Sequence, residues 1–228
     1  MGVVDPQSGR LYLAGGGTTS TELANSFIQD CGGPSSLILV MSQTRVEPER
    51  GSSSVDFLKE NGAKNVVLIG VADPKESDRK SVSDYLKKTR GIWIPGGDQK
   101  LFPKRWGVEW LRTEFTEALS RGVNFFGTSA GSMIMSDPMI AGPGSEADTV
   151  EFAPGIGLFP GLIDTHFVAR GRKKRFEDGL RQRKSQIGVG LDEGEWIVYQ
   201  DKAIIRIIGK PLILGVPLKL NGNSRLLE

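Results

Sequence analysis

The chain has 228 residues and a formal net charge of +2. The length is typical of a single α/β domain covering residues 1–228, and the near-neutral charge gives no indication of a nucleic-acid partner. The only cysteine, Cys31, excludes an intramolecular disulfide and a thiolate zinc site.

The sequence contains no membrane-spanning run, because residues 211–220 are interrupted by Gly, Pro and Lys. Residues 1–10 lack the apolar segment of a signal peptide. We therefore expect a cytoplasmic protein without a membrane partner.

Short apolar runs alternate with amphipathic segments along the first 130 residues. Strands are expected at residues 11–13, 37–41, 66–69, 92–94 and 123–126. Helices are expected after residue 17, where Thr19 and Glu22 have capping-box spacing, and at residues 55–61, 81–88 and 110–119. This alternation predicts a mostly parallel sheet with helices on both faces, in which ligands bind beyond the carboxyl ends of the strands.

The second half of the chain is less regular. Residues 136–154 are rich in Gly, Pro and acidic residues and predict a long irregular loop. Residues 187–191 form an apolar run that ends at an acidic pair. Residues 196–199 and 203–208 flank a Gln-Asp-Lys turn and predict a C-terminal β-hairpin near one edge of the sheet.

Residues 127–131 read Gly-Thr-Ser-Ala-Gly, directly after an expected strand, and residues 132–135 are expected to open a helix. Such a turn exposes the hydroxyl of its serine, here Ser129, as a nucleophile. The pattern alone is weak, because glycine and serine are common in this chain, and an ordinary glycine-rich turn is the alternative.

A serine nucleophile needs a base, and the only histidine is His166. The carboxylate that would orient this histidine remains open between Asp192 and Glu193, because adjacent residues of a strand point to opposite faces. Asp164 is a further candidate. Weaker candidates lie in the expected loop at Glu146, Asp148 and Glu151.

Backbone N–H groups must stabilise the oxyanion that forms on attack. Ala130 follows the nucleophile, and Gly97 lies in a second glycine-rich turn at a strand end. A basic cluster follows His166 and is either a solvated helix face or a carboxylate-binding site. Its members are Arg170, Arg172, Lys173, Lys174, Arg175, Arg181, Arg183 and Lys184. As surface residues, they are expected to contribute little to stability.

Five motifs occur in a fixed order and together resemble the cyanophycinase branch of peptidase family S51, which also contains the α-aspartyl dipeptidases. They are Pro-Gly-Gly-Asp-Gln at 95–99, the serine turn at 127–131, Met-Ile-Ala-Gly at 139–142, Asp-Thr-His-Phe at 164–167 with Arg170, Arg172 and Arg175, and Gly-Leu-Asp-Glu at 190–193.

The resemblance implies a three-layer sandwich like the flavodoxin-like fold of class I glutamine amidotransferases. It implies a triad of Ser129, His166 and Glu193 that forms an acyl-enzyme without a metal or other cofactor. Substrate contacts are implied for Gln99, Asp164, Thr165, Arg170, Arg172 and Arg175. The implied substrate is cyanophycin, an arginyl-bearing polyaspartate, or a related β-aspartyl peptide. The implied assembly is a homodimer.

Two departures from the family pattern affect the choice of substrate. Thr165 stands where the family has glutamine, and the chain is shorter than typical cyanophycinases. An α-aspartyl dipeptidase is therefore the second hypothesis, although that branch lacks the Arg-x-Arg-x-x-Arg pattern seen here. A binding protein that keeps the serine turn only as scaffold is the alternative from another functional class. The sequence leaves open whether cleavage is exo or endo.

Overall fold

The computed structural model describes residues 8–42, 48–71, 73–220 and 223–225. Residues 1–7, on which the expected absence of a signal peptide partly depends, lie outside this description. Within it, no helix has both the length and the apolar character needed to cross a membrane.

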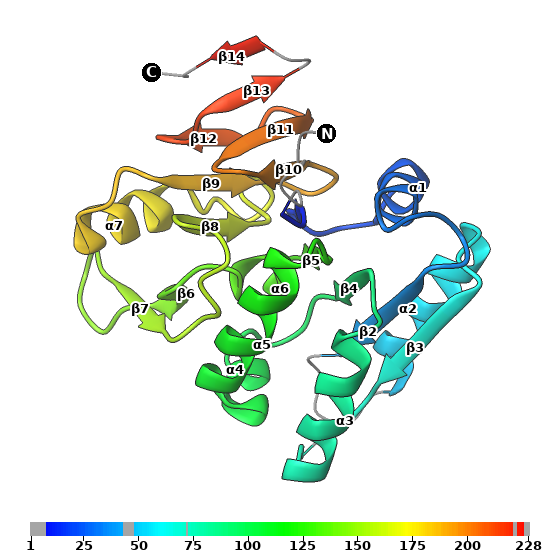
Figure 1. Ribbon diagram of the computed structural model, residues 1–228. Helices are drawn as coiled ribbons and strands as arrows, with labels where there is room; N and C mark the ends of the chain where they lie inside the picture. The colour runs from blue at the N-terminus through cyan, green and yellow to red at the C-terminus, as the bar shows by residue number, and fades with distance from the viewer. Residues whose placement is uncertain (1–7, 43–47, 72, 221–222, 226–228) are drawn as a thin grey trace, which may run out of the picture.

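A nine-stranded sheet forms the centre of the molecule, in the order β14-β13-β11-β10-β1-β5-β4-β2-β3 (Figure 1). One part of it consists of adjacent parallel strands, β1 (Leu11–Ala14), β2 (Leu37–Met41), β3 (Asn65–Ile69), β4 (Gly91–Ile94) and β5 (Asn124–Thr128). The sheet continues beyond β1 with β10 (Trp196–Gln200), β11 (Ala203–Ile208), β13 (Leu218–Leu220) and β14 (Asn223–Arg225).

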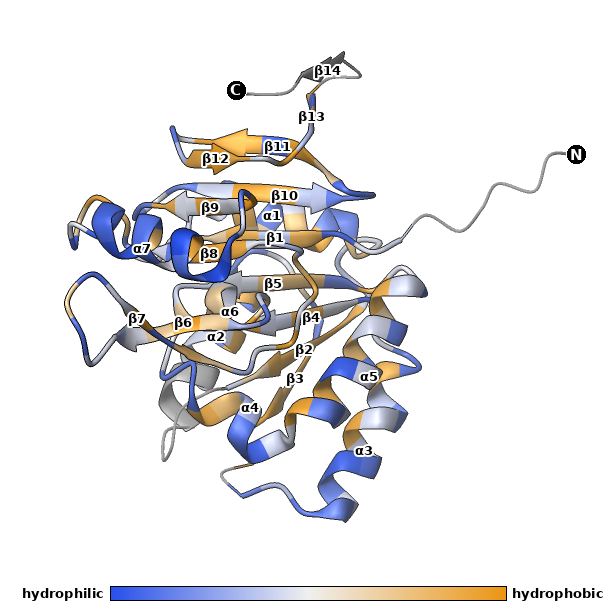
Figure 2. Ribbon diagram, turned by 90° about the vertical axis from the view of Figure 1, so that its left-hand side faces the viewer, coloured by the Kyte–Doolittle hydropathy of each residue, from blue (hydrophilic) through white to orange (hydrophobic). Residues whose placement is uncertain are grey.

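The parallel strands are apolar on both faces because helices cover both. Leu11 and Leu13 pack into one cluster with α3 (Glu76–Leu86), α4 (Leu101–Trp106) and α5 (Val108–Ser120). Tyr12 and Ala14 point the other way and pack with α1 (Thr21–Asp30) and α2 (Pro48–Glu60). The expected three-layer α/β sandwich is confirmed, and Figure 2 shows apolar strands between helices that turn hydrophilic residues outward.

A smaller sheet lies beside the central one. Two of its strands lead into His166 and Glu193 of the candidate site. It consists of β8 (Leu162–Thr165), β9 (Gly188–Leu191) and β12 (Leu212–Leu214), with β8 and β9 parallel. Ile163 and Val189 of these strands join the same core cluster as Leu13. This shared core fixes the ends of β8 and β9 relative to the ends of β1 and β5.

The prediction of a long irregular loop at residues 136–154 is wrong, because most of this segment forms an antiparallel hairpin of β6 (Met139–Pro143) and β7 (Val150–Ala153). The turn-forming residues are concentrated at the tip of the hairpin. Apolar residues of the strands, Ile140 and Val150, pack with Phe176 and Leu180 of α7 (Lys173–Arg183).

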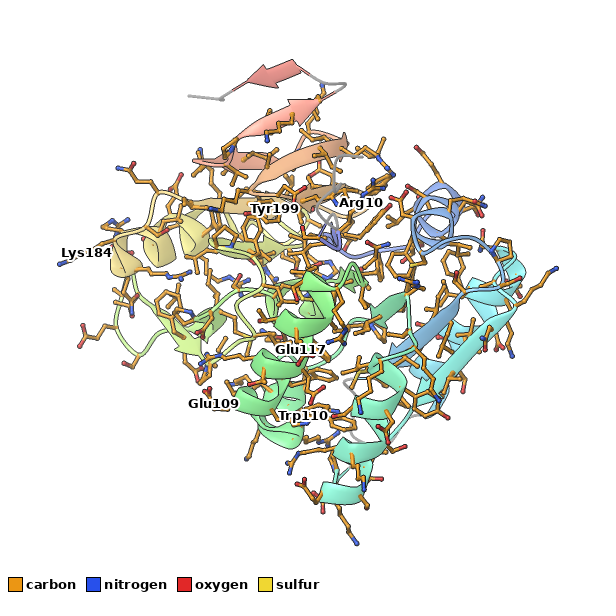
Figure 3. The ribbon with its side chains drawn as sticks, viewed as in Figure 1. Arg10, Glu109, Trp110, Glu117, Lys184 and Tyr199 are labelled. Atoms are coloured by element: carbon orange, nitrogen blue, oxygen red, sulfur yellow. The ribbon has the colours of Figure 1, made fainter. Side chains whose placement is uncertain are left out.

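Two smaller expectations also need correction. The N-cap of α1 is Ser20 rather than Thr19, because Ser20 Oγ accepts a hydrogen bond from Leu23 N at 3.2 Å. The hairpin of β10 and β11 forms as predicted, but it is not at an edge, because β13 and β14 extend the sheet further. Arg10, before β1, ties this hairpin to the core by donating from Nε to Gln200 Oε1 at 3.0 Å (Figure 3).

Candidate active site

Ser129 occupies a sharp turn between β5 and α6 (Ala130–Met133). Its φ of 51° and ψ of −119° are strained for a residue with a side chain. The glycines on either side allow the turn to close, because a Cβ on Gly127 would lie 2.7 Å from Ser132 N and one on Gly131 would overlap the Ile94 carbonyl oxygen. The expected strand–turn–helix is present, although α6 ends at Met133 after about one turn.

Ser132 holds this turn against the first strand. Its hydroxyl is fully buried, accepts from Ala14 N at 3.0 Å and lies 2.7 Å from the Gly127 carbonyl oxygen. Ser129 N donates to the Ala14 carbonyl at 3.0 Å. The position of Ser129 is therefore fixed by the end of β1 as well as by its own strand.

Ser129, His166 and Glu193 form a continuous hydrogen-bonded chain. Ser129 Oγ lies 2.8 Å from His166 Nε2, and His166 Nδ1 lies 2.6 Å from Glu193 Oε1. An ionised carboxylate can only accept, so Nδ1 carries the proton and Nε2 is left as the acceptor for the serine hydroxyl. The arrangement can deprotonate Ser129 during attack and stabilise the charge that then forms on the ring.

The loop after β1 supports the histidine and the glutamate, a role that we did not foresee for its three glycines, Gly15, Gly16 and Gly17. His166 N donates to the Gly15 carbonyl at 2.9 Å, and a Cβ on Gly16 would lie 2.6 Å from His166 Nε2. A Cβ on Gly17 would lie 3.0 Å from the Cβ of Glu193. The sequence signal was a glycine run directly after a buried strand.

The other candidates for the orienting carboxylate have different partners. Asp192 Oδ1 accepts hydrogen bonds from the backbone N–H groups of Val168 at 3.0 Å and Ala169 at 2.9 Å, rather than from the imidazole ring of His166. Burial works to raise the pKa of Asp192, but backbone N–H groups outweigh it and lower that pKa. Asp164 pairs with arginines instead of the histidine.

The two candidate oxyanion donors flank the nucleophile. Ala130 begins α6 immediately after Ser129. Gly97 belongs to the turn that follows β4, and a Cβ on its neighbour Gly96 would lie 3.4 Å from the Ser129 Cβ. The turn contacts the β6 hairpin through Gln99, whose Nε2 lies 3.4 Å from the Ala141 carbonyl oxygen.

Two members of the basic cluster, Arg172 and Arg175, hold a buried acid. Asp164 is fully buried, and Arg175 donates to both of its oxygens, with Nε at 2.9 Å from Oδ2. Arg172 Nη1 lies 3.4 Å from Asp164 Oδ1 and donates to the Thr165 carbonyl at 2.8 Å. Burial lowers the pKa of Arg172, and the neighbouring Arg175 charge lowers it further, against the effect of Asp164. One carboxylate thus serves two guanidinium groups, which leaves this trio with a net positive charge.

These contacts correct the expectation that the arginines are surface residues with little effect on stability. Arg172 and Arg175 are only 17% and 21% exposed in their side chains, and both hold Asp164. Asp164 and Thr165 are themselves fully buried. Arg170 is exposed, and its backbone N donates to the His166 carbonyl at 3.0 Å.

Asp164→Ala is expected to lower the free energy of unfolding by about 3–5 kcal/mol, because it leaves two partly buried guanidinium groups without their shared carboxylate. Urea denaturation of the purified protein measures this change. Glu177→Ala is the matched control, because it breaks an exposed ion pair on α7, with Lys173, and both of these side chains are at least half exposed. Equal destabilisation by the two variants would contradict a structural role for Asp164.

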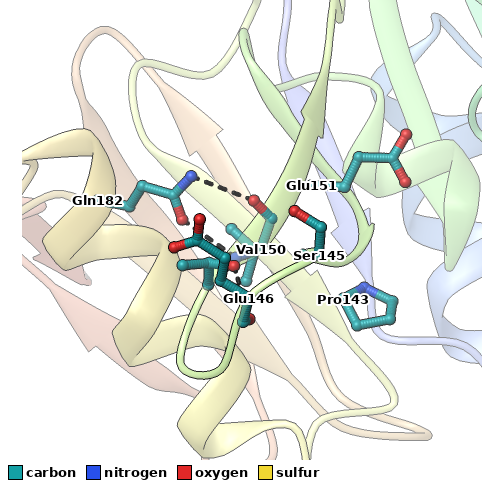
Figure 4. Close-up of a pocket in the computed structure, with 8 residues that line it drawn as sticks. Pro143, Ser145, Glu146, Val150, Glu151 and Gln182 are labelled. Carbon is teal, nitrogen blue, oxygen red and sulfur yellow. Dashed lines mark hydrogen bonds between the residues drawn. The ribbon is translucent and has the colours of Figure 1, made fainter.

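Two surface hollows lie apart from this chain of residues. One, of about 580 Å³, lies at the tip of the β6–β7 hairpin, beside the α7 residue Gln182, which hydrogen-bonds both the N–H and the carbonyl of Val150 (Figure 4). A more apolar one, of about 430 Å³, lies between Leu158, Tyr199 and Val216. Neither is lined by Ser129, His166 or Glu193, so the hydrogen-bonded geometry identifies the candidate site better than cavity size does.

Sequence and structure comparisons agree on the kind of protein that this chain resembles. The sequence model of peptidase family S51 matches residues 52–207. The cyanophycinase of Geminocystis herdmanii (strain PCC 6308) is 31% identical over 83% of this chain and 72% of its own length. That of Synechococcus elongatus is 26% identical, and the chain spans only 61% of its length.

Two solved structures share the fold. A peptidase from an acI-B1 Actinobacterium has a TM-score of 0.67 at 19% identity and is matched over 98% of both chains. A putative peptidase E protein from Listeria monocytogenes EGD-e has a TM-score of 0.62 at 16% identity, over 89% of this chain and all of the other. These similarities confirm the mostly parallel α/β architecture.

Proposed function

Because this chain belongs to peptidase family S51, and is a hydrolase of the serine peptidase type, we propose that Ser129, His166 and Glu193 are its catalytic triad. The observation that carries the proposal is the 2.8 Å distance between Ser129 Oγ and His166 Nε2, with Glu193 on the far side of the ring. No other histidine exists in the chain to act as the base.

The proposed reaction begins when Ser129 Oγ attacks the carbonyl carbon of the scissile peptide bond and His166 Nε2 takes the hydroxyl proton. The resulting oxyanion accepts hydrogen bonds from the N–H groups of Ala130 and Gly97. His166 then donates its proton to the leaving amine, and an acyl-enzyme remains on Ser129. Water, deprotonated by His166, hydrolyses this ester and restores the serine.

Covalent labelling tests the nucleophile directly. A serine-directed phosphonate is expected to add to Ser129, and peptide mapping by mass spectrometry will show the mass increase on the peptide that contains it. Wild-type protein that hydrolyses peptides but carries the label on another residue would contradict the assignment.

We propose that the substrate is an aspartyl peptide, either cyanophycin (multi-L-arginyl-poly-L-aspartate) or a related β-aspartyl peptide, which is cut to dipeptides. The cyanophycinases that resemble this chain favour this substrate, and the positive charge of Arg172 and Arg175 beside His166 suits a carboxylate. Each guanidinium has five N–H donors, more than its contacts with Asp164 and Thr165 use. Arg170, Gln99 and the buried pair Asp164 and Thr165 complete the proposed binding site, with the buried pair acting through the arginines.

An α-aspartyl dipeptidase is the second candidate, favoured by the fold shared with a putative peptidase E protein and by Thr165 in the position where cyanophycinases have glutamine. Incubation with cyanophycin, β-Asp-Arg peptides and α-aspartyl dipeptides, followed by mass analysis of the products, separates the two. Cleavage of α-aspartyl dipeptides alone would favour the second candidate.

Arg172→Lys and Arg175→Lys are each expected to lower kcat/KM for an aspartyl peptide by a factor that corresponds to roughly 1–3 kcal/mol, because lysine cannot form the planar, two-pronged contact with a carboxylate. The comparison uses the same peptide with that carboxylate amidated, on which wild type and variants should perform alike.

Lys173→Ala is the matched control for these variants, since the Lys173 side chain is 74% exposed and its ion-pair partner is Glu177 of the same helix. Melting temperatures of all variants show whether the Asp164 contacts survive. Equal impairment on the acidic and amidated peptides would contradict recognition of a carboxylate by the arginines.

A further inference from the structure

The backbone that follows His166 is held by the residue next to Glu193. Asp192 Oδ1 accepts from Val168 N at 3.0 Å and from Ala169 N at 2.9 Å. Just before this contact, Phe167 N donates to the Leu191 carbonyl at 3.2 Å. The end of β9 therefore fixes the three residues after the histidine, while Glu193 contacts its ring.

Asp192 holds the middle of this segment, the N–H groups of residues 168 and 169, while backbone contacts hold its ends: His166 N donates to the Gly15 carbonyl at 2.9 Å, and Arg170 N donates to the His166 carbonyl at 3.0 Å. His166 has a φ of 50°, a conformation that costs free energy for a residue with a side chain. Val168 is 73% exposed, so its apolar side chain does not anchor the turn in the core. The hydrogen bonds to Asp192 oppose rotation of this backbone, and rotation would move the imidazole away from Ser129.

We propose that Asp192 is a positioning residue, which acts through the backbone of residues 168–169 to keep His166 Nε2 within reach of Ser129 Oγ. The proposal rests on the proposed triad. In this proposal the two adjacent carboxylates position different parts of His166: Glu193 orients the imidazole ring, and Asp192 fixes the main chain that carries it. The lowered pKa of Asp192 agrees with a carboxylate that stays ionised while it accepts these backbone hydrogen bonds.

Asp192→Ala is expected to lower kcat, and the rate at which a phosphonate labels Ser129, by about 10- to 100-fold, because a small displacement of a catalytic group costs rates of this order. KM should change by less than about twofold, since Asp192 does not contact the proposed substrate site. Asp192→Asn keeps an oxygen acceptor at the same position and should stay within about threefold of wild type.

Asp78→Ala is the matched control, because Asp78 also accepts from a backbone N–H, that of Lys75 at 2.8 Å, at the exposed start of α3. It removes an equivalent carboxylate–backbone contact and should leave kcat unchanged. If Asp192→Ala retains wild-type kcat, or if Asp192→Asn is impaired as strongly as Asp192→Ala, the proposal is wrong.

A second measurement does not depend on turnover. The chain has one histidine, so labelling histidine with ¹⁵N gives a single imidazole in the NMR spectrum, and its Nδ1 proton should appear far downfield because of the short bond to Glu193. In Asp192→Ala this signal should broaden or shift, and in Asp192→Asn and Asp78→Ala it should stay unchanged. An unchanged signal in Asp192→Ala would overturn the positioning role. A wild-type protein that gives this signal but neither cleaves peptides nor reacts with phosphonate would overturn the proposed function instead.

Discussion

Ser129→Ala is expected to abolish peptidase turnover, with kcat reduced by about four orders of magnitude or more. The substitution removes the oxygen that we propose as the nucleophile and leaves His166 and Glu193 in place. The fold should not suffer, because alanine meets the same backbone strain at the φ of 51° as serine does. Peptide hydrolysis followed by mass spectrometry measures the activity, and thermal denaturation measures the stability.

Ser132→Ala is the matched comparison for this prediction. Ser132 lies three residues further on and is fully buried, and its hydroxyl links the ends of β1 and β5. Its loss is expected to reduce the free energy of unfolding by about 1–3 kcal/mol, because the Ala14 N–H loses a buried acceptor. Activity of Ser129→Ala within tenfold of wild type would show that another group is the nucleophile.

Gly16→Ala is expected to reduce kcat by about 100-fold or more, because the new methyl group would lie 2.6 Å from His166 Nε2, the proposed acceptor of the serine proton. The ring must move or the loop must shift, and both changes separate the base from Ser129. The φ of 112° at Gly16 adds backbone strain, since residues with a Cβ rarely adopt it.

Gly33→Ala separates these two effects. Gly33 has a similar positive φ of 91°, but a Cβ there would meet no atom within 4 Å. It should lose stability through backbone strain, by about 1–2 kcal/mol, and keep its kcat. Steady-state kinetics and melting temperatures of both variants complete the comparison. A Gly16→Ala enzyme that is destabilised like Gly33→Ala but fully active would show that the ring tolerates the methyl group.

Most of the central sheet could be predicted from the sequence because its strands are continuous apolar runs. Leu37 to Met41 is such a run, and the structure places it in β2. The β6–β7 hairpin could not be predicted in the same way. Its apolar residues pack against other elements, including Leu162 of β8 and Phe176 of α7, and a local pattern does not contain that information.

In the candidate site, too, some residues have a local sequence signal and others depend on long-range contacts. The serine turn has a local signature, since Gly127 is required by close backbone contacts within a few residues, with Gly131 and Ser132. The distinction between Asp192 and Glu193 depends on how β9 ends beside β8, so it stayed open until the family resemblance favoured Glu193. The role of Gly16 depends on a contact between residues 150 positions apart, and no spacing within one segment reveals it.

The dependence of His166 on the ends of β1 and β9 has a consequence for protein synthesis. A ribosome makes the chain from its N-terminus, so the Ser129 turn exists before its base, and the base exists before the carboxylate that orients it. The His166 backbone has its acceptor on Gly15, and Gly15 N in turn donates to Glu195. A nascent chain that has not yet paired β10 with β1 therefore carries the proposed nucleophile without the backbone contacts that position the proposed base. With the proposed triad, peptidase activity is therefore expected only after β10 has paired with β1.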